Sequence, residues 1–106
     1  MITSASNDKI KEIKKLIKSA SRRKETGLYI VEGIRMVREI PADAVKTLYV
    51  AESMTDKFAD ICNQIPAEVE IVRDSVFQSM SEFWRRYIRQ PQRRMIYLQV
   101  MRHRFF

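Results

Sequence analysis

Apolar residues near the N-terminus recur at the spacing of an amphipathic helix. At about 100° per residue they fall on one face, and several lysines fall on the opposite face. Asn7 stands just before this pattern, where its side chain can accept a hydrogen bond from an unpaired backbone N–H. We therefore predict a helix that starts after Asn7 and turns its apolar face to the core. The apolar positions are Ile10, Ile13, Leu16, Ile17 and Ala20.

Three short apolar runs follow, and each is typical of a buried strand. Helical patterns separate the runs, with Pro41 ending the first of these helices and Asp74 capping the last. Strands that alternate with helices predict an α/β fold, here a three-layer α/β/α sandwich with a mostly parallel sheet. The predicted strands are 28–31, 45–51 and 69–72, and the predicted helices after the first are 34–40, 55–63 and 75–80. Inward positions are Phe58, Ile61, Cys62, Val76, Phe77 and Met80, whereas Glu68, Glu70 and Arg73 face water.

The composition narrows the class of protein. The chain has 106 residues, enough for one small domain, and its 45% apolar and 31% charged residues are ordinary for a globular protein. No apolar run approaches the roughly 18 residues of a membrane-spanning helix. Acidic residues near the N-terminus argue against a mitochondrial presequence. The single cysteine, Cys62, excludes an internal disulfide framework and a cysteine-based zinc site, and it fits a cytoplasmic location.

The net charge of +7 is unevenly distributed. Residues 1–80 are nearly balanced, with 13 Lys and Arg against 12 Asp and Glu. Residues 81–106 contain seven arginines, no lysine and a single acid. Within the first part, the basic excess lies in residues 1–26, so the lysine face of the first helix leads directly into the cluster Arg22, Arg23 and Lys24. Such a stripe suits phosphate contacts, although a solvated helix surface explains the same pattern. A membrane-surface helix is disfavoured because the apolar face has no aromatic anchor.

The segment from Arg22 to Arg35, RRKETGLYIVEGIR, combines a basic cluster, a glycine, a strand and an acidic-glycine turn. Together with the upstream segment ITSASNDKIKEIKKL, it resembles the N-terminal substrate-binding domain of the SpoU/TrmH family of RNA 2'-O-ribose methyltransferases. The likeness covers roughly residues 2–80. The matching residues are Ser4, Asn7, Lys11, Arg22, Arg23, Lys24, Gly27, Tyr29, Val31, Glu32, Gly33 and Arg35.

The resemblance implies an RNA-binding domain whose fold is shared with ribosomal proteins that bind kinked RNA. It implies that RNA, either rRNA or tRNA, contacts the first helix, the basic loop after it and the start of the next helix. Gly27, Glu32 and Gly33 fix the turn that holds this loop in place. We therefore expect that replacing Arg22 and Arg23 by alanine weakens RNA binding and flattens its salt dependence. The implied RNA-binding residues are Asn7, Lys11, Lys14, Lys18, Arg22, Arg23, Lys24 and Arg35.

In the family, S-adenosylmethionine binds a C-terminal catalytic domain that also forms the dimer. None of that domain's motifs occurs in this sequence, and it has no metal-binding motif. We therefore expect no cofactor and no catalytic residue on this chain, no activity of the chain alone, and a monomer.

The resemblance stops after about residue 82, where the composition changes abruptly. We interpret residues 1–80 as the substrate-binding domain and residues 81–106 as an atypical arginine-rich tail, caused by truncation or a frameshift. Within the tail we expect a helix over residues 82–89 and an edge strand over residues 95–101, with the remainder poorly ordered. His103, the sole histidine, receives no catalytic role.

Two alternative interpretations remain open at this point. One is a free-standing module that binds structured RNA, like ribosomal proteins of similar fold, and it predicts tight RNA binding by the chain alone. The other is a truncation product without function, and it predicts poor soluble expression and rapid proteolysis of the tail.

Overall fold

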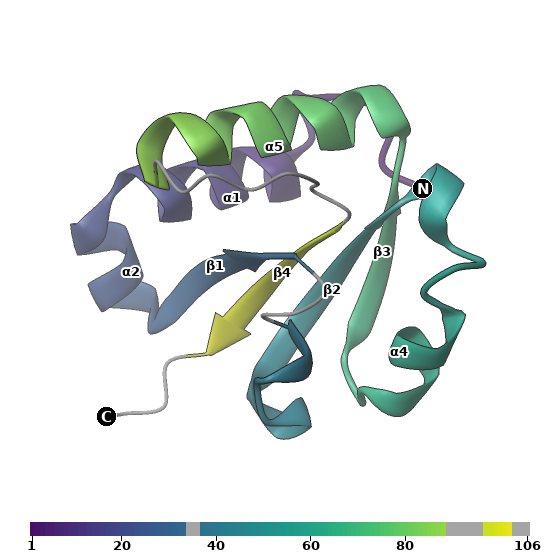
Figure 1. Ribbon diagram of the computed structural model, residues 1–106. Helices are drawn as coiled ribbons and strands as arrows, with labels where there is room; N and C mark the ends of the chain where they lie inside the picture. Colours follow the sequence, from purple (N-terminus) through teal and green to yellow (C-terminus); the bar gives the residue numbers. More distant parts are fainter. Residues whose placement is uncertain (34–36, 89–96, 103–106) are drawn as a thin grey trace.

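The computed structural model describes residues 1–33, 37–88 and 97–102, and it describes the side chains of residues 1–33 and 37–87. Along the chain, helices and strands alternate as the apolar pattern predicts (Figure 1). The helices are α1 (Asp8–Lys18), α2 (Ala20–Thr26), α4 (Ala59–Gln64) and α5 (Asp74–Ile88), with short 3-10 turns at Ala42–Ala44 and Glu52–Met54. The strands are β1 (Leu28–Glu32), β2 (Val45–Ala51), β3 (Glu68–Val72) and β4 (Tyr97–Arg102).

The four strands form one sheet in the order β1-β4-β2-β3. β2 and β3 pair in parallel, while β4 pairs antiparallel with both β1 and β2. It follows that β1, β2 and β3 share one direction, as the alternation predicts, but only one pair of neighbours is parallel. The sheet is mixed because β4 is inserted between two strands of the opposite direction.

The predicted edge position of the last strand was therefore wrong. Residues 97–102 form a strand, but it is an internal one with a partner on each side. At the β3 side of the sheet, the backbone of Ile2 pairs instead. Its N–H donates to the carbonyl of Ile71 at 2.8 Å, and its carbonyl accepts from Arg73 N–H at 2.9 Å. An apolar run in the sequence does not show whether its strand lies at the edge of a sheet or between two other strands.

Helices α1 and α5 lie beside each other over the same side of the strands, and α4 lies on the other side (Figure 1). The apolar face predicted for α1 is buried under α5 and the sheet, and Val76, Phe77 and Met80 of α5 join it. Phe58 and Ile61 are buried as expected, and Cys62 is partly buried. The α/β fold class is confirmed. None of the described helices is both long and apolar enough to cross a bilayer.

Three helix boundaries differ from the prediction. The helix predicted over residues 55–63 begins only at Ala59, as α4, and residues 55–58 form a turn. The first helix ends at Ser19, whose side chain accepts a hydrogen bond from Arg22 N–H and starts α2, so Ala20 is exposed and residues 22–24 are helical rather than a loop. α5 continues to Ile88 instead of ending near Met80. The expected boundary between residues 80 and 81 thus lies inside α5, where Trp84 is buried against the core. The predicted helix over residues 34–40 lies partly outside the described residues.

Candidate nucleic-acid surface

The outer face of α1 carries a row of lysines that have no ion pair within the described part of the chain. Asn7 Oδ1 accepts from Lys9 N–H at 2.8 Å and starts the helix, which fixes where each later side chain points. Because the buried positions fill one side of the helix, the lysines project from the other side. This lysine row consists of Lys11, Lys14, Lys15 and Lys18, of which Lys14 is half-buried and the others are exposed.

Arg22 does not extend the lysine row. Its guanidinium binds both carboxylate oxygens of Glu12, at 2.8 Å from Nε and 3.0 Å from Nη2, and Nη1 lies 2.6 Å from Glu25 Oε1. These carboxylates raise the pKa of Arg22 above its ordinary value. Glu12 lies about 100° or more around the helix axis from Lys11, Lys14 and Lys18, and about 60° from Lys15. The two-pronged ion pair therefore turns Arg22 toward the opposite flank of α1.

Arg23 also has a structural partner. Its Nη1 donates to the backbone carbonyls of Leu16 at 2.7 Å and Ile17 at 3.0 Å. These carbonyls belong to the last turn of α1, which has no further helical N–H groups to bond them. Arg23 thus closes the C-terminal end of α1. Of the predicted basic cluster, only Lys24 is exposed without an ion pair among the described residues.

The side of the lysine row that faces α5 contains two aromatic rings. The Nζ atom of Lys14 lies 5.6 Å from the ring centroid of Phe83, and the rings of Phe83 and Tyr87 are 4.7 Å apart with a 42° tilt. Tyr87 is 41% exposed. Positive charge beside an exposed aromatic ring suits both the phosphates and the bases of a nucleic acid.

The glycine and glutamate of the predicted turn have separate structural positions. Gly27 ends α2 in the left-handed conformation, with φ of 71°. Glu32, at the end of β1, is 1% exposed and accepts a 2.6 Å hydrogen bond from Ser81 Oγ of α5. Gly33 follows with φ of 106°. Arg35 lies outside the described residues.

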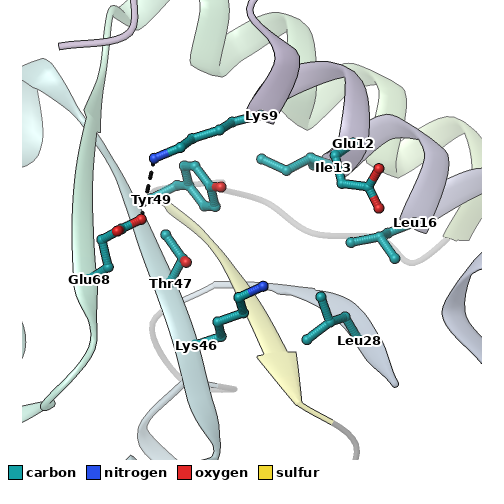
Figure 2. Close-up of a pocket in the computed structure, with 9 residues that line it drawn as sticks. All are labelled: Lys9, Glu12, Ile13, Leu16, Leu28, Lys46, Thr47, Tyr49 and Glu68. Carbon is teal, nitrogen blue, oxygen red and sulfur yellow. Dashed lines mark hydrogen bonds and ion pairs between the residues drawn. The ribbon is translucent and has the colours of Figure 1, made fainter. Parts of the chain in front are cut away.

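A cavity of about 190 Å³ lies on the other flank of α1, between this helix and strands β2 and β3 (Figure 2). Ile13, Leu16 and Leu28 form apolar walls, and the polar ends of four side chains enter it from α1 and β2. Lys9 crosses its mouth to β3, where it binds Glu68 Oε1 at 3.3 Å and also pairs with Glu70. The four polar side chains are Glu12, Lys46, Thr47 and Tyr49.

Sequence reasoning missed this cavity, because its polar residues are scattered over two elements. Thr47 and Tyr49 alternate along a strand that was interpreted only as apolar and buried, and Glu12 was used only as evidence against a mitochondrial presequence. The available signal was the pair of hydroxyl side chains, Thr47 and Tyr49, which lie two positions apart and so on the same face of a buried strand.

Comparisons with known proteins identify a family by sequence and a shared fold by structure. Residues 7–85 match the MRM3-like substrate binding domain. In structure, the chain is similar to an rRNA methyltransferase from Sinorhizobium meliloti, with a TM-score of 0.68, 19% identity and coverage of 99% of this chain and 37% of that one. An AdoMet-bound rRNA methyltransferase from the same organism has a TM-score of 0.67, again with 19% identity and coverage of 99% and 37%. The chain therefore spans little more than a third of the length of these structures. No curated protein sequence matches it.

Proposed function

The chain belongs to the family of MRM3-like substrate-binding domains of RNA methyltransferases, and we propose that it binds the RNA substrate through the lysine row of α1. Family membership assigns substrate binding to the fold. The lysine row is the described surface that best fits a polyanion, because three of its four lysines are exposed and none has a carboxylate partner among the described residues.

We choose this surface because of one observation, the position of the carboxylates around α1. On α1, the acidic partners lie on the flank that faces the sheet, where Glu12 holds Arg22. Within the described residues, no carboxylate lies within ion-pair distance of Lys11, Lys14 or Lys18. Phosphates approaching this face would meet positive charge, whereas on the opposite flank they would meet carboxylates as well as ammonium groups.

The proposal extends to the reaction that this binding serves. We infer that the RNA is an rRNA or a tRNA and that the methyl group goes to a ribose 2'-hydroxyl, as the SpoU/TrmH likeness implies. One of the similar structures is described as AdoMet-bound, so we place the S-adenosylmethionine site in a part of such proteins that this chain does not span. We also propose that such proteins form a dimer through that part, that this chain is a monomer, and that it is located in the cytoplasm.

The test is the salt dependence of RNA binding. In a filter-binding titration with a structured rRNA fragment, the variant with Lys11→Gln, Lys14→Gln and Lys18→Gln should bind more weakly. The slope of log affinity against log salt should fall in magnitude by about 2 to 3, the value for three lost phosphate contacts.

Lys57→Gln is the matched control, since it removes an exposed charge that lies far from α1 in sequence and beside the ring of Phe58. It should leave the slope nearly unchanged. A triple variant with the parent slope would overturn the choice of surface. Tight and specific binding by the chain alone would instead favour a free-standing RNA-binding module.

A further inference from the structure

We propose that the cavity between α1 and strands β2 and β3 binds a single guanine base. This goes beyond the proposed function, because the cavity lies on the flank of α1 away from the lysine row. The inference rests on the geometry of its polar groups (Figure 2).

Two residues of β2 that are buried overall direct their hydroxyl groups into the cavity. Thr47 is 6% exposed and Tyr49 is 5% exposed. Among the described residues, neither hydroxyl takes part in a hydrogen bond, and neither oxygen is one of the enclosed unpaired atoms, so both are reached from the cavity. Figure 2 shows the hydroxyl of Tyr49 pointing toward the space between Glu12 and Thr47. A bound ligand would supply the missing partners.

Opposite charges face each other across the same space. The carboxylate of Glu12 enters from α1, and the ammonium group of Lys46 enters from β2. Arg22 occupies one lone pair on each oxygen of Glu12, which holds the carboxylate in place and leaves further acceptor positions. Lys46 has no ion pair within the described residues, so its N–H groups remain available as donors.

The hydrogen-bond donors and acceptors of the cavity determine which chemical groups a ligand must present. A carboxylate requires N–H donors, while an ammonium group and a phenol hydroxyl donate to a carbonyl oxygen. The Watson–Crick edge of guanine presents a carbonyl beside two N–H groups, whereas adenine and cytosine lack that combination and uracil has a single N–H. The apolar side chains of Ile13, Leu16 and Leu28 can contact the faces of a flat ring. Bases read in protein pockets are bound in this way, by edge hydrogen bonds and apolar contacts.

The size of the cavity suits a single base rather than a larger ligand, and its charge balance suits an uncharged one. A cavity of about 190 Å³ is smaller than the roughly 300–1,000 Å³ typical of drug-sized ligand sites. The lining contains the carboxylates of Glu12 and Glu68 and the ammonium groups of Lys9 and Lys46, so its formal charges balance and give no net attraction for an anion. An uncharged base requires no such attraction.

Titration of the full chain with guanosine tests the proposal, with amide NMR spectra as the readout. We expect saturable shifts centred on Glu12, Lys46, Thr47 and Tyr49, and at least tenfold weaker binding of adenosine, since a site built for hydrogen bonds rejects a ligand that lacks them. Equal shifts with both nucleosides, or shifts located elsewhere, would overturn the proposal. Because guanosine is uncharged, this result does not depend on the lysine row or on the proposed function.

Two variants check the assigned contacts. Tyr49→Phe keeps the ring and should weaken guanosine binding about two- to tenfold, whereas Glu12→Gln should weaken it roughly tenfold or more. Glu52→Gln, an exposed carboxylate outside the cavity, is the control for the charge change. If Glu12→Gln fails to fold because Arg22 loses its partner, Tyr49→Phe still decides the matter. Parent affinity in Tyr49→Phe would contradict the assigned hydrogen bond.

A binding experiment with RNA distinguishes a base of the substrate RNA from a free nucleoside as the ligand. An RNA with one unpaired guanosine is compared with the same RNA carrying adenosine at that position. Tighter binding of the guanosine form assigns the cavity to a base of the substrate RNA, and this form of the inference rests on the proposed function. Equal binding of the two RNAs, together with guanosine binding, assigns the cavity to a free guanine nucleoside.

Discussion

The hydroxyl of Ser81 donates a 2.6 Å hydrogen bond to Glu32 Oε2 and thereby joins the end of β1 to the middle of α5. Both side chains are 1% exposed. Burial raises the pKa of Glu32 from its ordinary value of 4.5 to about 8, although the bond from Ser81 and the charge of Arg85 act in the opposite direction. The carboxyl group is therefore mostly protonated at neutral pH, which makes it a pH-sensitive link between sheet and helix.

The free energy of unfolding should fall as the pH rises from 4.5, the ordinary pKa of Glu32, to about 8, its pKa in the folded state. The folded state holds the proton up to about pH 8, whereas the unfolded chain releases it near pH 4.5. The folded state consequently binds more protons across this range, and the free energy of unfolding decreases by at most about 1.4 kcal/mol per pH unit. Below the range, the contribution of Glu32 is fully present.

Glu32→Gln should remove this part of the pH dependence, because the amide is neutral and its carbonyl can still accept from Ser81. At about pH 9 the variant should be more stable than the parent chain. Urea unfolding at a series of pH values measures both effects. Glu52→Gln, an exposed carboxylate, should retain the parent profile, and a Glu32→Gln profile parallel to that of the parent would contradict the assignment.

Arg23→Ala should act on folding more than on RNA. It removes two hydrogen bonds to the last turn of α1 and should lower the free energy of unfolding by about 1–2 kcal/mol. The salt slope of RNA binding should change far less than in the triple lysine variant. The sequence predicts that Arg22 and Arg23 both contact phosphate; because each has a partner within the domain, we propose that Arg23 serves mainly to hold the end of α1. Chemical denaturation and filter binding on the same preparation separate the two effects.

Gly27→Ala should destabilise the chain by about 1–2 kcal/mol through the backbone alone. A side chain at this position would meet no atom within 4 Å, but φ is +71°. Asparagine tolerates this conformation better, so Gly27→Asn should cost clearly less. Thermal unfolding of the two variants compares them directly. An equal loss in both would show that the left-handed conformation is not the cause.

Met80→Ala should be among the costlier single changes, at about 2–5 kcal/mol. Its side chain is completely buried between α5 and the rest of the core, so the substitution leaves a cavity. Gln78→Ala, an exposed change on the same helix, should stay within about 0.5 kcal/mol of the parent. Urea unfolding provides the comparison, and similar midpoints for the two variants would show that α5 does not anchor the core as described.

Much of the local structure followed from the sequence. Periodicity placed α1 and its buried face, and the apolar runs placed β1, β2 and β3 to within a residue at each end. These elements depend on short-range patterns, in which burial on one face repeats every two residues or every 3.6 residues. The amide of Asn7 was identified as a helix cap for the same reason, since its partner lies two residues away.

Tertiary contacts decided the rest. The insertion of β4 between β1 and β2 joins residues far apart in the chain, and the local pattern of an apolar strand does not encode which strands it pairs with. The same limit applies to charge. Arg22 and Lys18 look alike in sequence, but Arg22 meets Glu12 and Lys18 meets no carboxylate among the described residues.

The sequence by itself therefore determined the fold class, most of the elements and the family likeness. Only the tertiary structure decided which basic side chains remain available to a ligand, and only it brought Glu12, Lys46, Thr47 and Tyr49 around one cavity. The physical reason is that secondary structure depends on neighbours within a few residues. A binding surface depends instead on charges and hydroxyl groups that folding brings together from distant positions.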